Sequence, residues 1–286
     1  MPYKTIITTD ALAAHLSDRH FVLVDCRFKL DDVGWGEQQW RVGHIPGAVY
    51  AHLDRDLSGP KTGTNGRHPL PDPDVFARTL GRFGIGDHQV VAYDQDTGMF
   101  ASRLWWLLRW MGHDAVAVLD GGFARWVEEG RVVSESDSSR PAAEFHGSAR
   151  SDMTVTADTV ATVSARSDWR VLDARAPERY RGEVEPMDLV AGHIPGAASY
   201  FFQRNLNDRG GFRTPEDLRE RLRAVTGDVS PDHIVSYCGS GVQASHNLLA
   251  LEHAGIQGAK LYPGSWSEWV SDPSRPVATG SEKPDA

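Results

Sequence analysis

The sequence predicts an α/β protein made of two similar domains in tandem, each a mostly parallel sheet flanked by helices. The main observation is an internal duplication, in which the hexapeptide Gly-His-Ile-Pro-Gly-Ala occurs at 43–48 and again at 192–197. A second is that the expected strands are near-continuous apolar runs, which is typical of parallel strands covered on both faces. A third is the length of 286 residues, which suits two domains of ordinary size.

The duplication extends well beyond the hexapeptide. Three further pairs of matching segments keep the same order along the chain: 23–27 and 171–175, 90–94 and 234–238, and 120–126 and 263–269. The period is about half the chain, which is too long for a solenoid and indicates two similar domains.

Each half is expected to run through the same elements: strand, helix, buried strand, the hexapeptide turn, short strand, helix, strand, helix, strand and helix. Apolar, β-branched runs predict the main strands at 22–25, 89–93, 115–119, 170–173 and 233–237. Four residues support helix starts, the acidic ones in first turns and the prolines just inside later helices: Asp10, Asp158, Pro71 and Pro215.

A polar, serine-rich stretch at 134–141 separates the two halves. We therefore expect a first domain at 1–132, a linker at 133–150, a second domain at 151–275 and a disordered tail at 276–286.

Composition excludes several classes of function. The net charge of −9 argues against nucleic acid and against an anionic membrane surface as partners. No cofactor is expected, because no nucleotide-binding glycine motif follows a strand, and no metal, because the 12 histidines are dispersed. The start of the chain has no hydrophobic signal core and no apolar run reaches membrane-spanning length, so a cytoplasmic location is expected.

Cys238 is the main candidate for chemistry. It follows an apolar run and precedes Gly239-Ser240-Gly241 and an amphipathic segment that begins near Gln243. This order predicts a thiol at the carboxyl end of a buried strand, in a loop that opens a helix. We expect the N–H groups of residues 239–243, Val242 included, and the helix dipole to hold an exposed Cys238 sulfur as a thiolate, the nucleophilic form.

The first half differs at this point. The spacing from Tyr93 to Ala101 exceeds that from Tyr237 to Ala244 by one residue, and Asp94 stands where the second half has its thiol. A carboxylate cannot do thiolate chemistry, so the first domain is expected to lack the catalytic Cys. The other cysteine, Cys26, is expected to be a small buried core residue.

These motifs resemble the two-domain rhodanese family of sulfurtransferases over nearly the whole chain. The hexapeptide turn occurs twice, and the run 259–269 is similar to the closing motif of that family. The resemblance implies two rhodanese-like domains and a persulfide mechanism. In that mechanism Cys238 takes a sulfane sulfur from a small anionic donor and passes it to cyanide or a thiol acceptor, such as a thioredoxin-like protein.

Within the family, the loop that begins at Cys238 is similar to that of 3-mercaptopyruvate sulfurtransferases. The resemblance implies that Ser240 assists proton movement, that the loop residues Gly239, Gly241, Val242 and Gln243 bind substrate, and that arginines clamp the donor's carboxylate. Arg179 fits the first arginine, whereas Met187 stands where the second is expected. Arg181 is a possible replacement for it.

Alternatives remain open. The donor is expected to be 3-mercaptopyruvate, with thiosulfate as the alternative. More remote are a non-catalytic persulfide carrier and a rhodanese-fold cysteine phosphatase, which would have Arg six residues after the Cys, where this chain has Ala244. Without the resemblance, Arg179 and Arg181 would be solvated charges. His44 and His193 are expected to be structural, bonding backbone across their turns.

Overall fold

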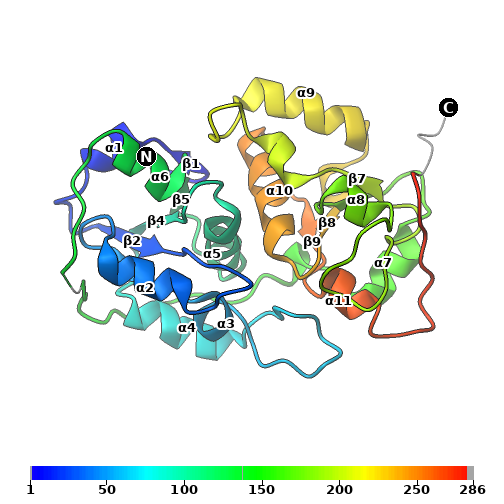
Figure 1. Ribbon diagram of the computed structural model, residues 1–286, viewed down its shortest axis with the longest axis horizontal. Helices are drawn as coiled ribbons and strands as arrows, with labels where there is room; N and C mark the ends of the chain where they lie inside the picture. The colour runs from blue at the N-terminus through cyan, green and yellow to red at the C-terminus, as the bar shows by residue number, and fades with distance from the viewer. Residues whose placement is uncertain (1, 137, 282–286) are drawn as a thin grey trace. The chain divides into compact units, whose positions relative to one another are not determined.

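The structure is a computed structural model that describes residues 2–136 and 138–281. The chain forms two compact units (Figure 1). Unit 1 contains the residues up to Gly59, Leu70–Arg150 and Leu206–Phe212. Unit 2 contains Pro60–Pro69, Ser151–Asn205 and the residues from Arg213 onward.

Unit 1 is built on a parallel five-stranded sheet of order β1-β5-β4-β2-β3. Its strands are β1 (Ile6–Ile7), β2 (Phe21–Asp25), β3 (Val49–Tyr50), β4 (Gln89–Tyr93) and β5 (Val116–Leu119). All residues of β2, β4 and β5 are buried, as expected for strands covered on both faces.

The helices of unit 1 cover this sheet on its two faces (Figure 1). They are α1 (Thr9–Ala13), α2 (Trp35–Val42), α3 (Leu53–Asp56), α4 (Pro73–Arg82), α5 (Met99–Trp110) and α6 (Gly122–Glu128). Leu12 of α1 and Trp126 of α6 pack in one core cluster with β2, β4 and β5. The proline expected inside the first turn of α4 is Pro73 rather than Pro71, because the Asp72 carboxylate caps the helix just before it.

Unit 2 repeats the arrangement with a parallel four-stranded sheet of order β7-β6-β8-β9. Its strands are β6 (Arg170–Asp173), β7 (Ala198–Ser199), β8 (Ile234–Tyr237) and β9 (Lys260–Leu261). The order matches β3-β2-β4-β5 of unit 1, so the predicted α/β class, the duplication and the parallel sheets are confirmed.

Helices flank the second sheet as well (Figure 1). They are α7 (Ala157–Val163), α8 (Pro177–Tyr180), α9 (Pro215–Thr226), α10 (Val242–His253) and α11 (Ser265–Trp269), with short 3₁₀ turns at Ser151–Met153, Phe202–Asn205 and Pro231–His233. Residues of α7 and α11 share a core cluster with β6 and β8. Helix α10 packs against β8, β9 and α9.

The repeated hexapeptide is a structural turn tied to the end of a strand. In unit 2 the buried Arg175 pairs with Asp173 at 2.7 Å and donates to the Gly192 carbonyl at 2.6 Å. His193 Nδ1 lies 2.7 Å from the Tyr180 carbonyl oxygen. Unit 1 repeats these bonds with Arg27, Asp25, Gly43, His44 and Trp40. Both histidines therefore bond backbone, as expected for structural residues.

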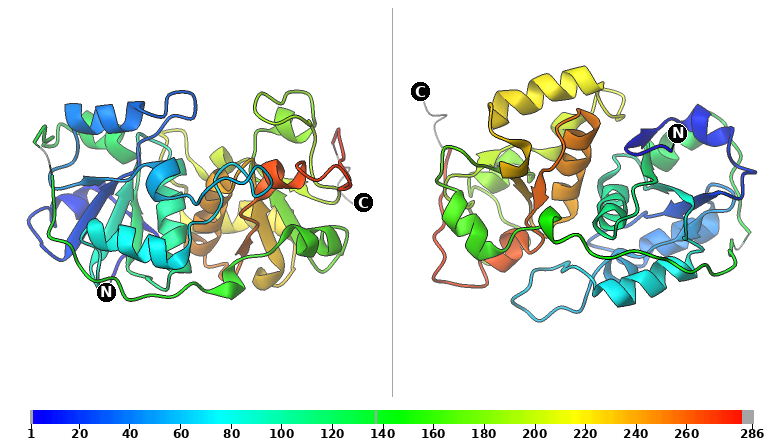
Figure 2. Two further views of the ribbon diagram at one scale, coloured as in Figure 1. Left: turned by 90° about the horizontal axis from the view of Figure 1, so that it is seen from below. Right: turned by 180° about the vertical axis from the view of Figure 1, so that it is seen from behind.

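Two segments belong to the unit that is built mainly from the other half of the chain. Residues 60–69 come from the first half of the chain but pack in unit 2, where Figure 2 shows them beside α11. Residues 206–212 come from the second half but belong to unit 1. The Phe212 N–H donates to Asp120 there at 2.7 Å. The domain bounds predicted from the sequence are continuous along the chain, so they do not include this exchange of segments.

The tail predicted to be disordered from 276 is hydrogen-bonded in its first part. His193 and Ala278 exchange backbone hydrogen bonds of 2.8 and 3.0 Å, and the Trp269 indole donates to the Pro276 carbonyl at 2.9 Å. The prediction of disorder is therefore wrong for residues 276–281, because polar groups in this segment form hydrogen bonds with unit 2. Residues 282–286 of the tail lie outside the described residues.

None of the helices in the described ranges is long and apolar enough to cross a bilayer.

Candidate functional site

Cys238 lies where the sequence places it, directly after β8 and before α10. Its Sγ accepts hydrogen bonds from the N–H groups of Ser240 at 3.4 Å and Gly241 at 3.1 Å. The left-handed conformation of Gly241, with φ 82°, turns the chain so that both amides face the sulfur. Two main-chain N–H dipoles therefore point their positive ends at Sγ.

Fewer N–H groups bind the Cys238 sulfur than the sequence predicts. Within the described chain, Gly239, Val242 and Gln243 donate no hydrogen bond to the sulfur. Val242 and Gln243 already belong to the first turn of α10. Their contribution is limited to the partial positive charge at the amino terminus of this helix.

The loop is fixed from the other side by the start of α11. Trp266 N–H donates to the Cys238 carbonyl at 2.9 Å, and the Ser265 hydroxyl accepts from the Cys238 N–H at 3.1 Å. Among the described residues Ser265 is the one non-glycine residue with positive φ, 56°. A strained residue that holds a nucleophile loop is a common feature of functional sites.

The prediction that the Cys238 sulfur is exposed is wrong. Cys238 is 1% exposed, and Ser240, two residues further along the chain, is 6% exposed. The sulfur turns inward toward the loop amides, and charged side chains from other segments lie over the loop.

Ser240 has a partner from a distant part of the chain. Its Oγ shares a hydrogen bond of 2.7 Å with Nδ1 of His68, which is 4% exposed. His68 lies in the segment 60–69, which packs in unit 2. A hydroxyl bonded to an imidazole can pass a proton in either direction, and it lies two residues from the thiol.

Two arginines lie over Gly239, next to the nucleophile. A Cβ placed on Gly239 would lie 2.5 Å from Nη2 of Arg67 and 3.7 Å from both terminal nitrogens of Arg179. Arg179 pairs with Glu185 at 2.6 Å and with Asp188 at 3.5 Å. Arg67 also pairs with Asp188. The predicted anchor Arg179 is thus beside the loop, with a second guanidinium that the sequence did not indicate.

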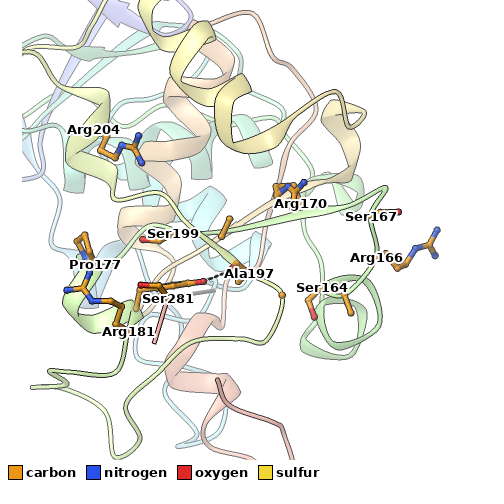
Figure 3. Close-up of a pocket in the computed structure, with 14 residues that line it drawn as sticks. Ser164, Arg166, Ser167, Arg170, Pro177, Arg181, Ala197, Ser199, Arg204 and Ser281 are labelled. Carbon is orange, nitrogen blue, oxygen red and sulfur yellow. Dashed lines mark hydrogen bonds between the residues drawn. The ribbon is translucent and has the colours of Figure 1, made fainter. Parts of the chain in front are cut away.

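Arg181 lies elsewhere. It pairs with Glu183 at 2.7 Å and lines a cavity of about 660 Å³, shown in Figure 3. Other residues of this cavity, such as Arg166 and Arg170, come from the amino-terminal side of β6. No residue from 238 to 243 lines it. The structure therefore does not place Arg181 where it could replace the missing arginine.

The equivalent loop of unit 1 holds a carboxylate in place of the thiol. Asp94 follows β4 directly, and five residues separate that strand from α5, against four between β8 and α10. The Asp94 carboxylate accepts from the N–H groups of Asp96, Gly98, Phe100 and Ala101 at 2.8–3.3 Å. The two loops therefore share a strand–loop–helix geometry but not a nucleophile.

The remaining cysteine is unsuited to chemistry. Cys26 is 1% exposed in unit 1, and burial together with the nearby carboxylates of Asp25 and Asp94 raises its pKa well above the usual value. A thiol held protonated is a poor nucleophile. This agrees with its prediction as a core residue.

Sequence reasoning missed three residues of the site: Arg67, His68 and Ser265. The first two stand in a segment rich in Gly, Thr, Pro and Asn, where charged residues without a helix or strand around them suggest function. Ser265 belongs to the repeated segment 263–269, which indicates a duplication and a family but assigns no role to this hydroxyl. None of the three is near Cys238 in the sequence.

The arrangement can perform nucleophilic chemistry on a small anion. A thiol held by two N–H groups supplies the nucleophile, the Ser240–His68 pair can move a proton, and two guanidinium groups can bind the anion.

Comparison with known proteins gives consistent relatives. A Pseudomonas aeruginosa protein, named provisionally as a 3-mercaptopyruvate sulfurtransferase, is 47% identical over 98% of this chain and 100% of its own length. A Mycobacterium tuberculosis protein, named provisionally as the thiosulfate sulfurtransferase SseB, is 39% identical over 97% of this chain and 98% of its own.

Solved structures agree with the sequence relatives. The crystal structure of SseA from Escherichia coli, described as a 3-mercaptopyruvate sulfotransferase with the rhodanese fold, matches with a TM-score of 0.80. It is 30% identical in sequence, and the match covers 92% of this chain and 99% of SseA. The rhodanese-like domain pattern itself matches residues 8–129 and again 156–272. The chain therefore belongs to the rhodanese-like domain family and carries two copies of that domain.

Proposed function

We propose that this protein is a sulfurtransferase that moves a sulfane sulfur through a persulfide on Cys238. The observation that carries the proposal is the geometry of Sγ, which accepts N–H groups from Ser240 and Gly241 at the carboxyl end of β8. The names of the relatives support the reaction class, since they are 3-mercaptopyruvate and thiosulfate sulfurtransferases.

The favoured donor is 3-mercaptopyruvate. The Cys238 thiolate attacks the donor sulfur, the carbon–sulfur bond breaks, and its electron pair goes to the carbon as the enolate of pyruvate. That enolate takes up a proton and leaves as pyruvate. Cyanide or a thiolate then attacks the outer sulfur of the persulfide and carries it away, which restores the Cys238 thiolate.

Ser240 and His68 are suited to the proton step. Their 2.7 Å hydrogen bond links a hydroxyl beside the sulfur to an imidazole, which can supply the proton that the enolate requires. Thiosulfate has no carbon leaving group and needs no such proton, so the pair favours a carbon-bound sulfur donor. Thiosulfate remains the alternative donor.

The proposed acceptor is cyanide or a small thiol-bearing partner such as a thioredoxin-like protein. A cytoplasmic, reducing compartment is proposed because both cysteines are free thiols and Cys238 must be reduced before each transfer.

The proposal is tested by steady-state sulfur transfer to cyanide. We expect kcat/KM to be higher with 3-mercaptopyruvate than with thiosulfate, and Cys238→Ser to reduce transfer from both donors to background. Cys26→Ser is the matched control, because it removes the other thiol in unit 1, and should retain transfer.

The other possible results of this assay test separate parts of the proposal. Transfer by Cys238→Ser at the wild-type rate would refute the nucleophile. Better turnover of thiosulfate would refute the donor preference only. Absence of turnover with either donor in the wild-type protein would favour a non-catalytic persulfide carrier.

A further inference from the structure

The cavity of unit 2 shown in Figure 3 has no part in the proposed sulfur transfer. Its volume is about 660 Å³, which lies within the range of small-molecule binding sites. It is lined by Ala198 and Ser199 of β7, the edge strand of the second sheet, and by none of residues 238–243. A ligand in this cavity would therefore bind apart from the loop that holds Cys238.

The cavity is positively charged. Four arginines line it, and none of the described residues that line it is Asp or Glu. This contrasts with the net charge of −9 of the whole chain. Figure 3 shows Arg166 and Arg170 on one side of the cavity and Arg181 and Arg204 on the other. A concave surface with charge of one sign concentrates ions of the opposite sign, so the cavity attracts anions.

Two of the four guanidinium groups have unused hydrogen-bonding capacity. Those of Arg170 and Arg204 form no ion pair and no hydrogen bond within the described parts of the chain, and Nε of Arg170 is buried without a partner there. The Arg204 guanidinium lies 4.9 Å from the centre of the Tyr200 ring, a contact that orients it but leaves its N–H groups unpaired. An anion between these two arginines would supply the acceptors that both lack.

The other two arginines are held only by surface carboxylates. Arg166 pairs with Asp168 at 2.7 Å, and Arg181 pairs with Glu183 at 2.7 Å. Both carboxylates are more than half exposed. Ion pairs in such exposed positions contribute little to stability, so an anion in the cavity can share these guanidinium groups at little cost.

Hydroxyl groups complete the set of donors. Four serines line the cavity together with the arginines: Ser164, Ser167, Ser199 and Ser281. Phosphate oxygens accept paired N–H groups from arginine and single hydrogen bonds from hydroxyls. A lone phosphate would reach the arginines on one side only, whereas a chain of two or three phosphates can reach both sides.

We infer that this cavity binds a compound with two or more linked phosphates, and that Arg170 and Arg204 are its main contacts. A nucleoside triphosphate and an inorganic polyphosphate share this chemistry. The inference concerns a site separate from Cys238, so it does not depend on the proposed function.

The test is isothermal titration calorimetry of the full chain with ATP and with inorganic tripolyphosphate, in a buffer without divalent cations or phosphate. We expect saturable binding of one molecule per chain, with a Kd below about 1 mM at about 0.1 M salt. Tighter binding of ATP would identify a nucleotide as the ligand, and equal affinity would identify the phosphate chain alone as the recognised group.

Substitution of the two unpaired arginines locates the site. Arg170→Gln and Arg204→Gln should each raise the Kd for tripolyphosphate about tenfold to a hundredfold, because each removes charge-assisted hydrogen bonds. Both should keep wild-type sulfur transfer to cyanide, which also shows that they fold. Arg221→Gln is the matched control, because it breaks an Arg–Asp pair on α9 of the same unit and should leave the Kd unchanged.

Arg179→Gln distinguishes this cavity from the arginines beside Cys238, and it should bind tripolyphosphate as the wild-type protein does. Three results would overturn the inference. One is the absence of saturable binding of either probe at about 1 mM. Another is binding that Arg179→Gln abolishes while Arg170→Gln and Arg204→Gln retain it. The third is tighter binding of citrate than of tripolyphosphate, which would make the site one for polycarboxylates.

Discussion

At the scale of residues, Cys238 and Asp94 show one loop geometry serving two different side chains. Each follows a buried strand and accepts N–H groups from the loop and helix after it. For the thiol, the N–H groups of Ser240 and Gly241 point their positive ends at Sγ. For the carboxylate, burial dominates and raises the pKa of Asp94 to about 6, although the N–H groups of Gly98, Phe100 and Ala101 act to lower it.

The raised pKa of Asp94 predicts a pH-dependent stability of unit 1. The folded protein binds this proton more tightly than the unfolded chain, whose Asp has its ordinary pKa near 3.8. The stabilising contribution is therefore complete below pH 3.8 and is lost as the pH rises through about 6. Asp94→Ala removes it. The cost of this substitution in unfolding free energy should be about 2 kcal/mol larger at about pH 4.5 than at about pH 7.

Urea denaturation of both proteins at the two pH values measures this difference. Asp87→Ala is a suitable control, since Asp87 is an exposed carboxylate that precedes β4, at the opposite end of the strand from Asp94. A substitution cost independent of pH would show that Asp94 is ionised throughout.

The sequence was sufficient for some residues of the site and not for others. Cys238 and Ser240 could be predicted because the nucleophile loop is continuous and its glycines mark it. Arg67 and His68 could not, because their position depends on a loop without regular secondary structure packing in the other unit. The burial of Cys238 could not be predicted either, because spacing does not say that its sulfur turns inward toward the amides of its own loop.

At the scale of elements, the connection from β8 to α10 converts a parallel strand into a sulfur-binding loop. Apolar runs predicted β8 and the equivalent β4 closely, since strands buried on both faces leave a clear pattern. The difference of one residue between the two loops was also evident from spacing alone. Spacing alone could not predict which amides point at the sulfur, because their direction depends on the left-handed φ of Gly241.

Gly241→Ala tests this element directly. A Cβ in the left-handed region costs about 1–2 kcal/mol, and relaxing that strain would turn the amides of Ser240 and Gly241 away from Sγ. Sulfur transfer should fall at least about tenfold, as for the loss of an anion-stabilising donor. The iodoacetamide reaction of Cys238 at neutral pH should slow.

Gly98→Ala is the matched control for this variant. Gly98 precedes α5 as Gly241 precedes α10, and its φ is 77°. This substitution should destabilise unit 1 but leave the alkylation rate of Cys238 unchanged. Equal alkylation rates for Gly241→Ala and the wild-type protein would contradict the role given to the two amides.

At the scale of the whole molecule, the duplication supplies two similar units, and only one carries a thiol in its loop. The fold class, the family and the duplication were predictable because repeated motifs and buried strands are local patterns. The exchange of residues 60–69 and 206–212 was not, because nothing in a loop's composition says which of two similar sheets it will pack against. This exchange brings His68 and Arg67 to the loop of Cys238.

The most direct measurement of the central claim is the mass of the peptide that contains Cys238 after treatment with 3-mercaptopyruvate and no acceptor. The account predicts a gain of one sulfur atom on this peptide, lost again when cyanide is added, with no gain on the peptide that contains Cys26. An unmodified Cys238 in protein that goes on to transfer sulfur to cyanide would contradict it.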